Sequence, residues 1–80
     1  MRLDKFLKTS RLIRRRTVAD DACSAGRVLV NGKEAKSSYR LTVGDVIQIN
    51  LGQHPVTVEV TELLDHATKE TAPSMYRQID

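Results

Sequence analysis

Basic side chains crowd the first sixteen residues of the chain. Seven of these residues are Lys or Arg, and Asp4 is the only acid among them. Guanidinium and ammonium groups neutralise phosphate, and arginine also forms paired hydrogen bonds to it that lysine cannot match. The pattern predicts a phosphate-binding strip, whose members we take to be Arg2, Lys5, Lys8, Arg11, Arg14, Arg15 and Arg16.

The charge is divided unevenly between the two halves of the chain. Residues 1–40 contain eleven bases and four acids, whereas residues 41–80 contain two bases and six acids. A formal net charge of +3 therefore hides a strongly positive first half. Such a concentration is typical of nucleic-acid binding, where bases neutralise phosphates. Two alternatives stay open: a solubilising surface, and an adaptor whose acidic second half binds a basic protein.

Residue types that carry catalysis or bind metals are scarce. The single cysteine, Cys23, excludes an internal disulfide, and we expect it to pack in the core. The two histidines, His54 and His66, lack the spaced partners that a metal site needs, and no nucleophile or nucleotide motif is present. We therefore expect no enzyme activity, catalytic residue, cofactor or metal. No apolar run suggests a membrane span or secretory signal, which favours a cytoplasmic protein.

The elements that must position the basic strip are two short helices. Leu3, Phe6 and Leu7 fall on one arc of a helix predicted over residues 2–9, with the bases on the opposite arc. Residues 10–16 form a connector that is either a further helical turn or a loop. A second helix is predicted from an N-cap at Thr17 to Gly26, with Val18, Ala22 and Ala25 on its apolar face.

After Gly26 the apolar residues alternate, as they do in strands. Asn31-Gly32 predicts a tight hairpin after residues 28–30, and further strands are expected over 46–51 and 56–64. We also expect Tyr39 and Leu41 to turn inward. The fold class is therefore α+β: two N-terminal helices packed on a small antiparallel sheet. We assign residues 1–64 to an RNA-binding domain and residues 65–80 to a mobile tail, with docking of Met75, Tyr76 and Ile79 as one short turn as the alternative.

Short motifs at four places in the chain point to a known family. RLDKFL at residues 2–7, RT at 16–17, AGRV and VNGK between 25 and 33, and VGDVI at 43–47 occur in this order. Together they resemble the RNA-binding domain of the ribosomal-protein-S-four type, also called the αL module, over residues 2–49. The resemblance implies the αL fold and docking of the two helices and the nearby loop on RNA. The same module is fused to catalytic domains in RNA-modifying enzymes, but no catalytic segment is present here.

The whole chain is most similar to the short stand-alone members of this family. These are the group of ribosome-associated quality-control protein P (RqcP) and the related fifteen-kilodalton heat-shock group, whose long basic C-terminal extension is missing here. The resemblance implies docking on ribosomal RNA of obstructed large subunits that carry peptidyl-tRNA. It also implies that the chain supports C-terminal alanine tailing by the tailing factor RqcH. Whether the chain contacts the tRNA as well as the ribosomal RNA stays open at this point. A general structured-RNA-binding protein without a tailing role is the alternative.

A few residues beside the strip have two interpretations. Asp4 is expected to pair with Lys8 at i, i+4, while the alternative is that it orients Arg16 toward RNA if the two helices pack together. Asp4, Arg27, Lys33 and Lys36 are candidates for a second RNA contact, although solvation of the sheet edge explains the three bases equally well. We expect a monomer.

Overall fold

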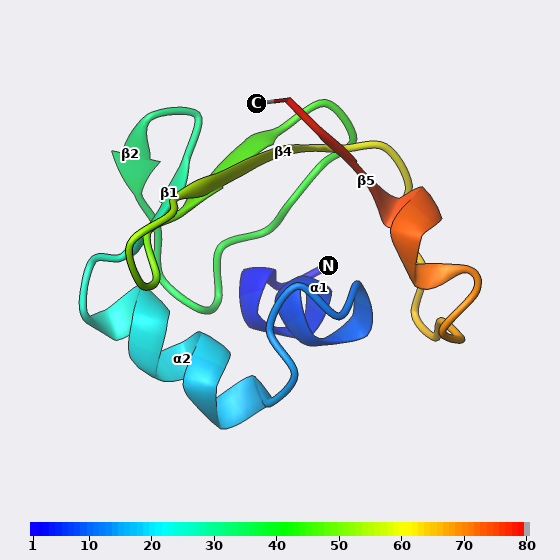
Figure 1. Ribbon diagram of the computed structural model, residues 1–80, viewed down its shortest axis with the longest axis horizontal. Helices are drawn as coiled ribbons and strands as arrows, with labels where there is room; N and C mark the ends of the chain where they lie inside the picture. Colours follow the sequence, from blue (N-terminus) through cyan, green and yellow to red (C-terminus); the bar gives the residue numbers. More distant parts are fainter. Residues whose placement is uncertain (80) are drawn as a thin grey trace.

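The computed structural model describes residues 1–79 and has an α+β architecture in two layers, with two helices below a curved antiparallel sheet (Figure 1). The helices are α1 (Leu3–Thr9) and α2 (Arg16–Ser24). The strands, together with one 3₁₀ turn, are β1 (Val28–Val30), β2 (Lys33–Glu34), β3 (Val46–Ile49), β4 (Val56–Val60), η1 (Ala72–Met75) and β5 (Tyr76–Gln78). The five strands follow the order β2-β1-β3-β4-β5, and every neighbouring pair is antiparallel. The predicted fold class is confirmed.

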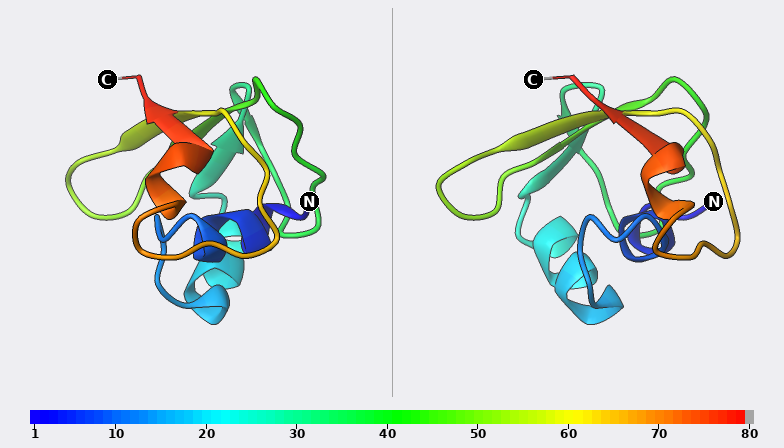
Figure 2. Two further views of the ribbon diagram at one scale, coloured as in Figure 1. Left: turned by 90° about the vertical axis from the view of Figure 1, so that its right-hand side faces the viewer. Right: turned by 45° about the vertical axis from the view of Figure 1, so that its right-hand side comes forward.

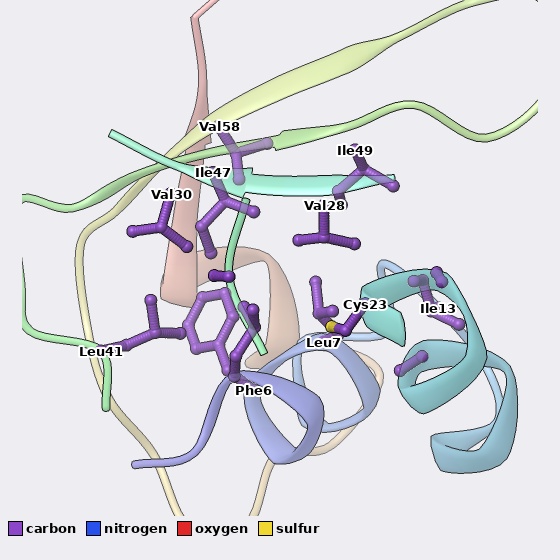
Figure 3. Packing of buried hydrophobic residues seen from close by; sticks show 14 of the residues in the cluster. Phe6, Leu7, Ile13, Cys23, Val28, Val30, Leu41, Ile47, Ile49 and Val58 are labelled. Atoms are coloured by element: carbon purple, nitrogen blue, oxygen red, sulfur yellow. The ribbon is translucent and has the colours of Figure 1, made fainter. Parts of the chain in front are cut away.

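Helix α1 lies directly under the sheet because its apolar residues recur at helical spacing. Leu3, Phe6 and Leu7 are all fully buried, as their shared arc predicts. Figure 3 shows Phe6 and Leu7 pointing up from α1 toward the sheet. There they meet the inward side chains of β1, β3 and β4, which include Val28, Ile47 and Val58. This packing fixes the face of α1 that stays in solvent.

Helix α2 begins earlier than its sequence suggests. Its first residue is Arg16 and its N-cap is Arg15, which makes no side-chain capping bond, so the predicted cap at Thr17 is wrong. The buried face is made of Ala19, Ala22 and Cys23, whereas Val18 is exposed. Packing against α1 selects this face, because small side chains allow close approach, and it overrides the local capping preference.

The hairpin between β1 and β2 forms where Asn31-Gly32 predicts it. Both residues have positive φ, +53° and +85°, as a tight hairpin turn requires. Strands β3 and β4 end at Ile49 and Val60, before the predicted limits of 51 and 64. In the segment before β3, Leu41 is buried as expected, but Tyr39 is exposed and the prediction for it is wrong.

The structure differs most from the sequence expectation after residue 64. Residues 72–78, predicted as part of a mobile tail, form η1 and β5 instead (Figure 2). β5 pairs with β4, and Met75 is fully buried in the core. Ala72 is buried as well, Tyr76 packs against the core, and the antiparallel ladder to β4 satisfies the backbone of the segment. The last residue of the predicted tail, Asp80, lies outside the described residues.

Among the described residues, neither a membrane-spanning helix nor a metal-binding cluster is found, and one buried thiol stands apart. Across residues 1–79 no helix has the length and apolar character of a membrane span. The same residues contain no cluster of His, Cys, Asp and Glu that would hold a metal ion. Cys23 is buried, and this burial raises the pKa of its thiol above the ordinary value. Its predicted role in core packing therefore fits its position.

Candidate nucleic-acid interface

The start of α1 and the start of α2 meet at one carboxylate, Asp4. Arg2 reaches Asp4 through Nε and Nη2, at 3.2 and 3.3 Å from Oδ1 and Oδ2. Arg16 approaches from α2, with its Nε at 3.2 Å from Oδ2 and its Nη2 at 3.5 Å from Oδ1. Both guanidinium groups therefore bind the same carboxylate through two nitrogens.

Burial separates the roles of the three charges. The Asp4 side chain is only 5% exposed, while those of Arg2 and Arg16 are 50% and 49% exposed. Burial alone raises the pKa of Asp4. Four interactions outweigh this effect of burial. They are the hydrogen bond from Arg16, the 2.8 Å hydrogen bond from the backbone N–H of Lys5, the positive charge of Arg16 and the hydrogen bond from Arg2. The pKa of Asp4 is therefore below its ordinary value, and the group is a fixed anion at neutral pH.

This geometry shows which side chains Asp4 pairs with. The carboxylate bonds to Arg2 and Arg16, not to Lys8, so the expected i, i+4 pair is wrong. The reason is that Asp4 lies on the buried side of α1, facing α2, whereas Lys8 is exposed. Each arginine has five N–H donors and gives two of them to Asp4, which leaves three directed elsewhere. Asp4 thus orients two half-exposed guanidinium groups.

The connector between the helices holds the next basic residues of the strip. It is a turn rather than a continuous helix, because Arg11 adopts a left-handed φ of +65°. Ser10 and Ile13 are buried on either side of it, and the backbone N–H of Ile13 bonds to the carbonyl of Leu7. With both flanks anchored in this way, Arg11 and the neighbouring Arg14 are left in solvent.

The remaining predicted residues are distributed around this centre. Lys8 and Arg15 are exposed, the latter at the N-cap of α2. Lys5 instead pairs with Asp65, with Nζ 3.4 Å from Oδ1. The structure therefore gathers the strip along α1, the connector and the start of α2, but directs Lys5 toward the C-terminal segment.

The three bases of the second candidate RNA contact, Arg27, Lys33 and Lys36, do not lie together. Lys36 and Arg2 line one open hollow of about 580 Å³, which adjoins the Asp4 cluster. Arg27 lies between α2 and β1, and Lys33 lies on the edge strand β2. Lys36 is thus placed beside the main cluster, whereas Arg27 and Lys33 are exposed at the end of α2 and at the edge of the sheet.

Comparison with known proteins identifies the fold family. The S4 domain model matches residues 1–47, which include both helices, the hairpin and the start of β3.

The chain belongs to the S4 domain family.

Similar proteins share nearly the whole length of this S4 chain. A protein of Bacillus subtilis named "RQC P-site tRNA stabilizing factor" is 51% identical over 76 residues, covering 95% of this chain and 88% of that protein. A protein of Streptococcus pneumoniae with the same name is 49% identical over 79 residues, covering 99% and 90%. The identity therefore extends through the segment after residue 64 that the S4 model does not cover.

Solved structures resemble the complete fold. The structure titled as trimeric heat shock protein 15 of Vibrio cholerae aligns with a TM-score of 0.92 at 29% identity, over 99% of this chain and 81% of that one. The solution structure of a hypothetical protein, HP1423, aligns with a TM-score of 0.85 at 28% identity, over 100% and 98%. Both confirm that the S4 helices sit on an antiparallel sheet.

Sequence reasoning missed the basic residue of the C-terminal segment that faces the S4 helices. Lys69 lines a hollow together with Lys8, Arg11 and Arg14. It is separated from them by more than fifty residues and lies outside the S4 match. The excess of bases in residues 1–16 could not reveal it, because only the return of the chain to α1 brings it there.

Proposed function

We propose that this chain is a non-catalytic RNA-binding factor that docks on the ribosomal RNA of obstructed large subunits and stabilises the peptidyl-tRNA in the P site. The single observation that carries the proposal is the Asp4 cluster. A buried anion holds Arg2 and Arg16 side by side, with free N–H donors that fit phosphate oxygens. The name shared by the similar proteins of Bacillus and Streptococcus supports the choice of RNA.

Binding by this surface depends on the shape and the backbone of the RNA. Folded RNA is recognised largely through phosphates and 2′-hydroxyls, since side chains do not reach its deep major groove. The cluster and the connector offer rigid cations for this purpose, and no aromatic side chain contributes to the cluster. The first N–H groups of α2 add to the attraction, because a helix N-terminus also favours anions.

The proposal also covers where and how the factor acts in the cell. We infer that the factor acts in the cytoplasm as a monomer and needs no cofactor. By holding peptidyl-tRNA on the large subunit, this chain would keep the substrate in place and so support C-terminal alanine tailing by the tailing factor RqcH. The role of this chain is then positional: it lowers the free energy of the bound tRNA and makes or breaks no bond.

The proposal is tested by where the protein sediments. In sucrose gradients of a lysate with stalled translation, we expect the protein with free large subunits that carry peptidyl-tRNA, and much less of it with joined ribosomes. Deleting the gene should reduce alanine tails on the stalled peptides. Equal occupancy of joined ribosomes, or unchanged tails in the deletion strain, would contradict the proposed function. Sedimentation with neither particle would favour a protein-interaction adaptor.

A further inference from the structure

A second basic site lies at the other end of α1 from Asp4. An open hollow of about 790 Å³ forms between the connector and the C-terminal loop, and its walls include Lys8, Arg11, Arg14, Asp65, His66 and Lys69. Figure 2 shows this loop, in yellow and orange, passing beside α1. The hollow is large enough for part of a polynucleotide strand and is open to solvent on one side.

The hollow has a strong excess of positive charge. Lys8, Arg11, Arg14 and Lys69 form no ion pair with any acid in residues 1–79. The one acid in the wall, Asp65, is already bound by Lys5 from outside the hollow. Four unneutralised bases around one concave surface repel one another, and an anion placed between them removes that repulsion.

The loop that carries Lys69 is held in a defined position. Leu63, Leu64 and Ala67 pack against the core. Thr68 and Thr71 then cap each other: the N–H of Thr68 donates to Oγ1 of Thr71 at 2.8 Å, and the N–H of Thr71 donates to Oγ1 of Thr68 at 3.2 Å. The backbone around Lys69 is therefore fixed opposite α1 before any ligand binds, which reduces the entropy cost of binding.

The backbone of Arg11 supports the same site. A left-handed conformation is costly for a residue with a Cβ, and such strain persists where the surrounding structure holds it. Here the buried side chains of Ser10 and Ile13 hold it, and it turns the chain so that Arg11 lines the hollow.

We propose that this hollow binds the phosphodiester backbone of the same RNA that contacts the Asp4 cluster, so that the interface extends beyond the S4 match onto residues 65–69. The inference rests on the proposed function and adds a contact that this function does not require. His66 is the one aromatic ring in a lining that holds four basic side chains, so the charged phosphodiester backbone is the part of the RNA that fits best. Helix α1 is only about 10 Å long, so a few nucleotides span both sites.

Lys69 is the residue to replace in the test, because it belongs to the hollow but not to the N-terminal strip. We compare Lys69→Ala with Arg77→Ala, an equal loss of charge on β5. Binding to purified large subunits that carry peptidyl-tRNA is measured at several salt concentrations. We expect Lys69→Ala to weaken affinity about two- to fivefold and to reduce the slope of log affinity against log salt by about one. Arg77→Ala should change neither quantity.

The outcomes separate this inference from the proposed function. If the wild-type protein binds with a steep salt dependence and Lys69→Ala has the wild-type affinity and slope, the hollow does not hold RNA and the inference is overturned, while the function stands. An equal effect of Arg77→Ala would also overturn it, because it would show only a general effect of net charge. A wild-type protein that does not bind these subunits would overturn the function and, with it, the inference. Thermal unfolding of both variants confirms that each is folded.

Discussion

Replacing Arg2 and Arg16 together with alanine is expected to weaken binding to obstructed large subunits by about 10²- to 10⁴-fold and to abolish support of alanine tailing. Each guanidinium is half exposed and keeps free donors for phosphate. A hydrogen bond to a charged group contributes roughly 1.5–3 kcal/mol, and each 1.4 kcal/mol is a factor of ten in affinity. The loss is measured by cosedimentation with purified subunits and by the length of alanine tails in cells.

A second variant separates lost contacts from a damaged fold. Removing both arginines leaves the buried Asp4 with only the N–H of Lys5, which is costly in itself. The pair Arg2→Lys and Arg16→Lys keeps a positive charge beside Asp4 but loses the paired N–H geometry. We expect this variant to unfold near the wild-type temperature and still to bind much more weakly than the wild-type protein. Wild-type binding by the alanine variant would show that the cluster is structural and does not contact RNA.

Shortening Met75 to alanine is expected to lower the free energy of unfolding by about 2–5 kcal/mol. Met75 is fully buried in the core, and its backbone carbonyl accepts hydrogen bonds from the N–H groups of Thr61 and Glu62. The side chain fixes η1 and β5 against the sheet, so its loss leaves a cavity where the C-terminal segment meets the core. Denaturant unfolding followed by circular dichroism measures the change.

The control for this prediction is Ile79→Ala, at the same end of the chain. Ile79 is 43% exposed and follows β5 directly. We expect this change to cost less than about 1 kcal/mol, since exposed substitutions leave little or no cavity. Equal small effects of the two variants would mean that residues 72–78 are not part of the cooperative fold and that the tail begins at residue 65.

The sequence predicts those parts of the fold that repeat a pattern over several residues. The stripe of Leu3, Phe6 and Leu7 and the Asn31-Gly32 turn are both found as expected, because local spacing and backbone preference determine them. The segment around Met75 has no such repeat: a four-residue 3₁₀ turn and a three-residue edge strand are too short to produce one. It is stabilised by pairing with β4, which only the folded structure reveals.

For the candidate site, too, the sequence predicts one part and only the folded structure reveals the rest. The abundance of bases predicts the strip, but composition cannot show which base meets which acid. Asp4 has a suitable partner at i+4, and only the packing of α1 on α2 turns it toward Arg16 instead. Lys69 reaches the strip through the path of the C-terminal loop, which the sequence pattern after residue 64 does not predict.

The central claim is that the Asp4 cluster lies against RNA on obstructed large subunits. The most direct measurement is ultraviolet crosslinking of the protein bound to these subunits, followed by identification of the crosslinked peptides and nucleotides. We predict crosslinks to ribosomal RNA or tRNA within residues 2–16, where the cluster and the connector lie, and none at Arg77 on β5. Crosslinks confined to the outer strands of the sheet, with residues 2–16 unmodified, would contradict the account.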